Sequence, residues 1–297
     1  AVGGYSYFTG VISAMRFNTT GSQNTAIGLG SLRVNSTGSY NVALGGQSLY
    51  NNTTASYNTA VGFQAAYSNT TGTQNTAVGR LALFSNTTGE FNIALGNGTL
   101  ENNTTASNNT AVGYQALYTN TTGANSTAVG YKAGFSNTTA GALDAFGWGA
   151  AQNNTTGDSI SAHGTQALHN NTTGSYNSAF GRYALFSNTT SINNTAVGYE
   201  AGYSQTTNGS NTAIGFNALY SNTGSVSTAV GEYAGRLATG NFNTFIGRGA
   251  GYNATTGTQN TFVGVGRYGV SARVGEAMTT GSKNTIIGAF GGTQGAR

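Results

Sequence analysis

Carboxylates are the first candidates for chemistry in this chain, because two of them held about 5–10 Å apart can hydrolyse a glycosidic bond. Asp144 and Asp158 are fourteen residues apart, so neighbouring coils of a repeat fold could bring them close. The other five acids are scattered, at Glu90, Glu101, Glu200, Glu232 and Glu276. No segment around them predicts a pocket that would raise a carboxyl pKa. We interpret the acids as solvated side chains and predict that the chain is not an enzyme.

Two histidines are the next candidates, since imidazole nitrogens bind metal ions. His163 and His169 are six residues apart and would lie on opposite runs of one coil. His163 stands where most repeats carry Val or Ile. If three chains surround an axis, an inward His163 would form a ring that could bind an ion. A solvated or hydrogen-bonded His163 is the favoured interpretation, and we expect no cofactor.

Composition excludes several function classes. Only 6% of residues are charged, against roughly 25% in typical soluble domains. The formal charge of +4 comes from scattered residues such as Arg33 and Arg182, so nucleic-acid binding, which needs a basic cluster, is not predicted. No stretch approaches the roughly 20 apolar residues of a membrane span, and we expect no membrane insertion. The chain begins at Ala1 without a leader pattern, so we expect a processed chain or a fragment.

The organising feature of the chain is a repeat of seventeen residues. The unit Asn58-Thr59-Ala60-Val61-Gly62 ends in a glycine that recurs at steps of seventeen from Gly28 to Gly215. Later steps of sixteen, sixteen, seventeen and twenty-four residues lead to Gly288. We therefore divide the chain into a degenerate N-terminal coil (1–23), a repeat array (24–264) and an altered C-terminal coil with an end segment (265–297). The extra residues of the longest step are expected to leave the stack around 265–268.

Each repeat predicts one coil of a solenoid. Thr59 and Val61 alternate with Ala60 as in a short strand, and residues 63–68 form a second short extended run. Residues 69–74 contain Asn-Thr-Thr-Gly, which favours a turn. The chain has no proline, which suggests that turns as well as strands need their N–H donors. We predict an all-β, parallel β-solenoid (β-roll) of about seventeen-residue coils, with two short strands per coil.

Stacking such coils places equivalent side chains in columns along the axis. One column predicts a structural amide ladder of the kind that reinforces stacked parallel strands. It consists of Asn35, Asn52, Asn69, Asn86, Asn103, Asn120, Asn137, Asn154, Asn171 and Asn188. A second Asn column precedes the strand and is interrupted at Ser126, Leu143 and Ile160. The coils around this interruption contain the only Trp and both His residues, and they are interpreted as drift or as a contact patch.

Aromatic side chains form a third column. A slender solenoid has more apolar surface than one thin core can hide, so these rings could seal an interface between chains or contact a glycan. The candidates are Tyr50, Tyr67, Phe84, Tyr118, Phe135, Trp148, Phe186, Tyr203 and Tyr220.

The repeats resemble two groups of fibrous proteins. The Asn-Thr-Ala-Val-Gly unit is similar to the degenerate head repeat of YadA-type trimeric autotransporter adhesins, although those coils are shorter. The longer unit 114–123, together with 243–247 and 284–288, resembles repeats of bacteriophage tail-fibre proteins. The similarity covers nearly the whole chain and implies a homotrimer built around a common axis.

The leading hypothesis is a structural or adhesive fibre segment of a phage tail or similar appendage. It would be extracellular, act as a rigid trimeric spacer on the order of 80 Å long at about 4.8 Å per coil, and could contact host-cell glycans. The head of a bacterial trimeric surface adhesin is the alternative. An ice-binding solenoid is a further alternative, suggested by Thr columns such as Thr53 with Thr70 and Thr54 with Thr71. Those Thr residues are expected in turns, whereas ice binding favours a flat strand face.

Overall fold

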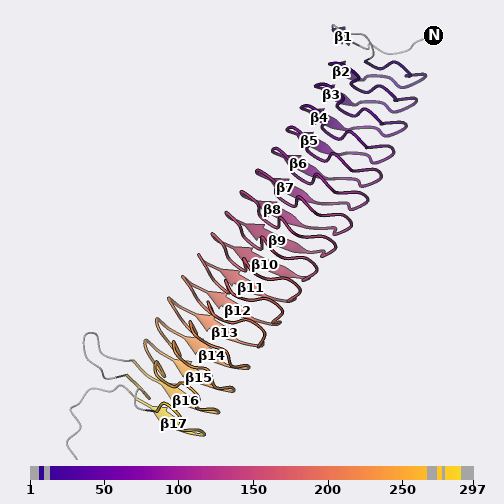
Figure 1. Ribbon diagram of the computed structural model, residues 1–297. Helices are drawn as coiled ribbons and strands as arrows, with labels where there is room; N and C mark the ends of the chain where they lie inside the picture. Colours follow the sequence, from indigo (N-terminus) through magenta and orange to yellow (C-terminus); the bar gives the residue numbers. More distant parts are fainter. Residues whose placement is uncertain (1–6, 10–13, 266–272, 276–277, 289–297) are drawn as a thin grey trace, which may run out of the picture. The chain divides into compact units, whose positions relative to one another are not determined.

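The fold was analysed from a computed structural model that describes residues 7–9, 14–265, 273–275 and 278–288. These residues form short parallel strands and turns, and none of them is in a helix. The chain divides into two compact units, Ala1–Thr156 and Gly157–Arg297. Within each unit, successive coils stack so that each places one strand beside that of the preceding coil (Figure 1). The predicted all-β parallel solenoid with coils of about seventeen residues is confirmed.

The strands are three or four residues long. In the first unit they are β1 (Tyr7–Thr9), β2 (Thr25–Ile27), β3 (Val42–Leu44), β4 (Thr59–Val61), β5 (Thr76–Val78), β6 (Ile93–Leu95), β7 (Thr110–Val112), β8 (Thr127–Val129) and β9 (Leu143–Phe146). In the second unit they are β10 (Ile160–His163), β11 (Ser178–Phe180), β12 (Thr195–Val197), β13 (Thr212–Ile214), β14 (Thr228–Val230), β15 (Thr244–Ile246), β16 (Thr261–Val263) and β17 (Thr285–Ile287).

Most of the three-residue strands turn one small residue inward and two residues outward. In β4, Ala60 is fully buried and pairs with Ala77 of β5, while Thr59 and Val61 stay partly exposed. Thr and Val favour the extended backbone because of their branched Cβ atoms. Ala is small enough for the opposite wall of the thin coil to approach, and that wall supplies larger side chains such as the buried Leu49 and Leu83. The core is therefore a column of Ala packed near a column of Leu.

Exceptions to this core pattern are compensated locally. Phe245 and Phe262 replace the inward Ala, and both are fully buried. Glycines replace the large residue of the opposite wall, because a Cβ at Gly251 would lie 2.2 Å from the Phe245 ring and one at Gly275 would lie 2.4 Å from the Phe262 ring. The total side-chain volume is thus kept roughly constant, as close-packed cores require.

The predicted second strand of each coil is wrong. Residues 63–68 form a turn rather than an extended run, since Gln64 has φ = 56° and Ala66 has φ = 50°. Equivalent non-glycine residues repeat these left-handed conformations in other coils, including Gln47, Leu49, Leu81 and Leu83. A left-handed residue breaks the period-two alternation of a strand, so Ala65 and Ala66 can both be buried.

Backbone hydrogen bonds join neighbouring coils in the turns as well as in the strands. Ala66 donates to Ala82 O at 2.9 Å, Ser68 donates to Phe84 O at 2.9 Å, and Thr70 donates to Thr87 O at 3.0 Å. A proline at such a position would remove one donor from the stack, which accounts for the absence of proline from a chain rich in turns.

The ends of the array keep the same register. Thr25 of β2 pairs with Tyr7 of β1, and Thr261 of β16 pairs with Thr285 of β17 across the longest repeat. Residues 266–268 of the expected excursion lie outside the described residues, as do Gly10 of the first coil and residues 289–297 of the end segment. Val274, within the long repeat, is fully buried, and its carbonyl accepts a 2.8 Å hydrogen bond from Gly251.

Replacing Gly62 by Ala should destabilise the solenoid. Gly62 has φ = +134°, and a Cβ there would lie 2.6 Å from the carbonyl oxygen of Gly79. We expect a loss of at least about 1–3 kcal/mol in unfolding free energy, the usual cost of such a conformation for a residue with a side chain. Urea denaturation followed by circular dichroism measures this loss.

Gly46→Ala is the matched control for Gly62→Ala. A Cβ at Gly46 would meet the Phe63 ring at 3.4 Å, an ordinary contact, and Gly46 does not have a left-handed φ. The denaturation midpoint of this variant should stay close to that of the parent. Equal losses in the two variants would contradict the assigned role of the closing glycine.

Candidate functional site: side-chain columns of the solenoid

The first Asn column lies inside the coils and forms an amide ladder. Asn52 donates from Nδ2 to Asn35 Oδ1 at 2.8 Å and to the turn carbonyl of Ala55 at 3.0 Å, and its side chain is fully buried. In the first unit, the ladder bond recurs at every step from Asn18 to Asn154. In the second unit, Asn188 donates to Asn171 Oδ1 at 2.6 Å. Each amide therefore links two coils and closes a turn.

The second Asn column has a different function. Asn58 donates from Nδ2 to Gly72 O, fourteen residues later, at 3.0 Å, and its own N–H donates to Asn41 Oδ1 at 2.9 Å. Its side chain thus ties the start of the strand to the turn that closes the coil. Where the column is interrupted, Leu143 is fully buried, and a Cβ on Gly134 would lie 2.9 Å from its Cδ2 atom. An apolar contact replaces the amide at this coil.

The ladder is interrupted at Gln205, which stands seventeen residues after Asn188. Gln205 is 1% exposed, and neither its Nε2 nor its Oε1 has a hydrogen-bond partner. Asn188 Oδ1, which would accept the next rung, is also buried without a partner. The extra methylene of Gln moves the amide out of line with the rungs, and buried polar atoms without partners are destabilising.

Replacing Gln205 by Asn should therefore stabilise the second unit. The shorter amide can donate to Asn188 Oδ1 as the preceding rung does, and we expect a gain of about 1–3 kcal/mol in unfolding free energy. The midpoint of thermal or urea unfolding measures this gain. Asn69→Gln, the reverse change at an intact rung, should cost a similar amount. A neutral or destabilising Gln205→Asn would show that rung continuity is not the relevant interaction.

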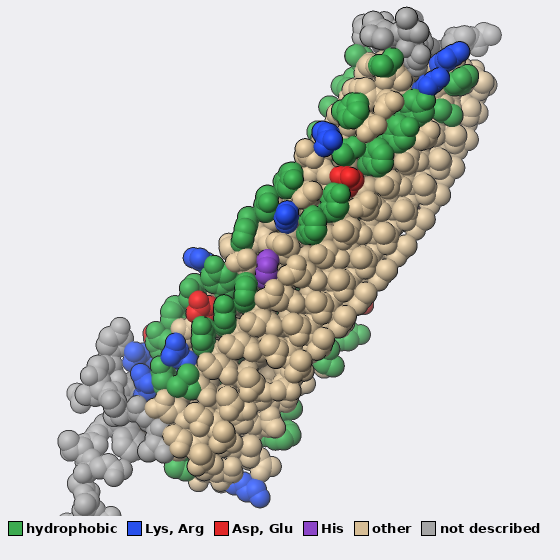
Figure 2. All heavy atoms as spheres, in the orientation of Figure 1, with side chains coloured by type: hydrophobic (Ala, Val, Ile, Leu, Met, Phe, Trp, Pro, Cys, Tyr) green, Lys and Arg blue, Asp and Glu red, His purple; other side chains and the backbone are tan. Residues whose placement is uncertain are grey.

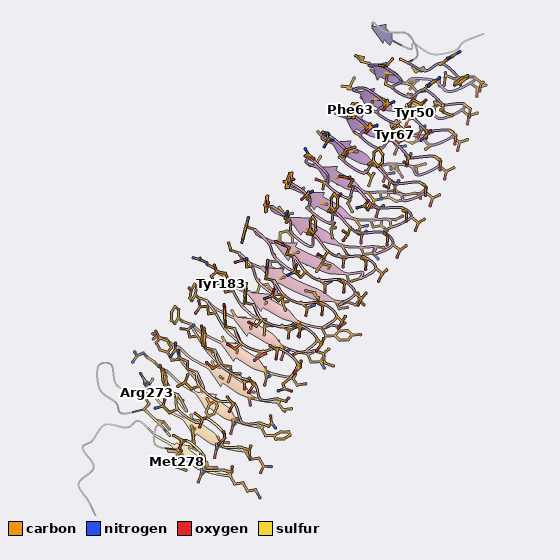
Figure 3. All side chains as sticks on the ribbon, in the orientation of Figure 1. Tyr50, Phe63, Tyr67, Tyr183, Arg273 and Met278 are labelled. Atoms are coloured by element: carbon orange, nitrogen blue, oxygen red, sulfur yellow. The ribbon has the colours of Figure 1, made fainter. Side chains whose placement is uncertain are left out.

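The predicted aromatic column lies on the turn run, which we define as residues 63–68 and the equivalent residues of other coils. Its members stack on one another. The rings of Tyr50 and Tyr67 are 5.1 Å apart with planes 19° from parallel, and Tyr67 stacks on Phe84 at 5.2 Å (Figure 3). Further stacks join Tyr118 with Phe135 and, in the second unit, His169, Phe186, Tyr203 and Tyr220 in order. These side chains are half-buried, and burial raises the pKa of Tyr203. Neighbouring rings occupy the ring faces, so solvent meets mainly their edges.

Trp148 belongs to another column, that of the residue after the closing glycine. It is 48% exposed and stacks on Tyr131 at 6.2 Å, while Tyr131 stacks on Tyr114 at 5.4 Å. A further exposed column consists of the residues that directly precede the second Asn column. In it, the rings of Tyr40 and Tyr57 stack with their centroids 4.9 Å apart. Sequence reasoning missed these two exposed columns. Their fixed positions on either side of the strand were the signal that could have revealed them.

Glu101 interrupts the aromatic column. Its Oε1 accepts a 3.4 Å hydrogen bond from the hydroxyl of Tyr118. Desolvation raises the pKa of Glu101 above its ordinary value, while the Tyr118 hydrogen bond and the charge of Arg80 partly oppose that rise. The folded protein therefore holds this proton more tightly than the unfolded chain does.

Glu101→Gln should remove a destabilising charge at neutral pH. Because the folded-state pKa is raised, stability falls as pH rises from the ordinary glutamate value through the folded-state pKa. The variant should therefore melt at a higher temperature than the parent at neutral pH, and the difference should shrink below the ordinary glutamate pKa. Melting curves across this pH range test the sign. Tyr118→Phe, which removes an interaction that favours the charged form, should make the parent's pH dependence steeper.

The remaining candidates for chemistry are two aspartates and two histidines. Asp144 lies on β9 of the first unit, whereas Asp158 precedes β10 of the second. His163 occupies an outward position of β10, 4.8 Å from the Phe180 ring, and His169 stacks on Phe186. Among the described residues, no three His, Cys, Asp or Glu side chains gather in a way that could hold a metal ion. The ion-binding ring of His163 depends on a trimer and stays a prediction.

The chain was also compared with known proteins. Neither protein-family models, nor curated proteins, nor solved structures gave a match. Over the described residues, the structure contains no helix of the length and apolarity that crossing a membrane requires. The function is therefore inferred from the columns themselves.

Proposed function

We propose that this chain is a non-enzymatic segment of an extracellular fibre, such as a phage tail fibre, and that it works as a rigid homotrimeric spacer. The observation that carries this proposal is the hydrogen bonding between coils in both strands and turns of each unit. Bending or opening a coil would break several of these bonds at once, together with one Asn rung. Such a solenoid suits a part whose task is to hold a distance and resist unfolding.

The chemistry of the stack supports an extracellular role. The ladder consists of Asn side-chain amides, which carry no charge and do not titrate at any physiological pH. Salt screens exposed charges, but only 6% of the residues are charged. Arg248 and Glu232 form an ion pair at 2.8 Å. Stability should therefore depend little on salt.

Association of three chains and contact with host glycans complete the proposal. Exposed apolar side chains are numerous for a chain with so few charges, and they include Tyr57, Phe63 and Trp148. Surfaces of this kind are typical of protein partners or ligands. Exposed tyrosine edges and hydroxyls offer both apolar contact and hydrogen bonds to a sugar.

The native mass in solution tests the proposal. Light scattering should give three times the 30.1 kDa of one chain, and this mass should be unchanged in high salt because the stack depends little on charge. The trimer should also persist in denaturing detergent until it is heated. A monomer at micromolar concentration would refute the trimeric fibre.

A further inference from the structure

The outward side of the strands is the most apolar exposed surface of the first unit. We define the strand face by four columns. They are the residue that directly precedes each Asn of the second Asn column, the two outward residues of each strand, and the residue that follows the closing glycine. Its exposed large apolar members in the first unit are Ile27, Leu29, Tyr40, Tyr57, Phe63, Val78, Phe91, Ile93, Tyr114, Tyr131, Phe146 and Trp148. The charged residues of the strand face in the first unit are Arg80 and Asp144. Figure 2 shows hydrophobic side chains in rows beside a broad area of backbone and of side chains that are neither hydrophobic nor charged.

The strand face is more exposed than the aromatic column that the sequence favoured as an interface. Tyr57 and Phe63 are 59% and 50% exposed. Tyr50, Tyr67 and Phe84 are less exposed, because they are half-buried in a continuous stack of rings. Rings stack along the columns of both surfaces, but the strand-face rings leave a larger fraction of their area in water. The strand face retains the apolar area that association could still bury.

We infer that the strand face is the surface through which copies of this chain associate, an inference that rests on the proposed homotrimer. The three strand faces would turn towards the common axis, and the aromatic column of the turn run would stay on the outside.

The area of the face is sufficient for a stable interface. A large aromatic side chain offers about 200 Å², so a half-exposed one leaves about 100 Å² in water. The eight aromatic and four aliphatic residues named above therefore expose on the order of 1,000 Å² in the first unit alone. A stable interface buries about 800 Å² on each partner.

The spacing of the face favours a second copy over an unrelated partner. Its side chains repeat once per coil, at the strand spacing of about 4.8 Å, so a matching surface needs the same repeat along its whole length.

Paired arginine substitutions test which face associates. Val78→Arg with Ile93→Arg places two charges on outward positions of β5 and β6, which are 37% and 40% exposed. Thr71→Arg with Thr88→Arg adds the same charge to nearby coils in the exposed turn column. The strand-face variant should have the mass of a monomer and a normal circular dichroism spectrum, while the turn variant should stay trimeric. A strand-face variant that remains trimeric would overturn this inference and leave the proposed fibre standing, and a monomeric wild type would overturn both.

Thiol labelling gives a second test that does not depend on the charged variant folding. The chain has no cysteine, so Val78→Cys and Thr71→Cys each introduce a single thiol. In the assembled protein, a bulky maleimide should label Cys at position 78 at least about tenfold more slowly than Cys at position 71, because the interface must open first. Equal labelling rates in the trimer would exclude the strand face as the interface.

Discussion

Hydrogen bonding between equivalent backbone groups of neighbouring coils is the constraint on which the rest of this structure depends. A single coil buries too few apolar groups to offset the conformational entropy of ordering about seventeen residues, at roughly 1–2 kcal/mol each. Stacking supplies the missing interactions, because each strand and much of each turn bonds to the coil beside it. Each coil must therefore return its strand to the register of the preceding one, and the longest repeat, of twenty-four residues, still places Thr285 opposite Thr261.

The unusual backbone of the turn run follows from this constraint. Left-handed conformations at Gln64 and Ala66 are unfavourable for residues with a Cβ. They persist because the same turn exists in the next coil and supplies hydrogen-bond partners for it. The closing glycine meets a stricter limit, since the carbonyl of the next coil occupies the space where a Cβ would be. Strain is thus distributed over every coil and offset by its neighbours.

The side-chain columns follow from the same register. A residue at one position of the coil meets its equivalent in the next coil, so amides form rungs and aromatic rings stack. This geometry tolerates substitutions that are compensated within one or two coils, as where Phe245 faces glycine. A longer side chain at a rung is not compensated in this way, and Gln205 and Asn188 are left with unpartnered buried atoms. A periodic surface is a further consequence, and it underlies the proposed self-association.

Much of the fold could be predicted from the sequence alone. The seventeen-residue period, the Thr-Ala-Val strand, the closing glycine and the alignment of Asn side chains all follow from residue types that recur at fixed spacing. Only the tertiary structure showed that residues 63–68 turn, because left-handed conformations at Gln64 and Ala66 depend on hydrogen bonds from the adjacent coil and not on residue type. That turn decides which side chains are half-buried and which remain exposed. The sequence therefore determined the columns, and the tertiary structure decided which of them face solvent.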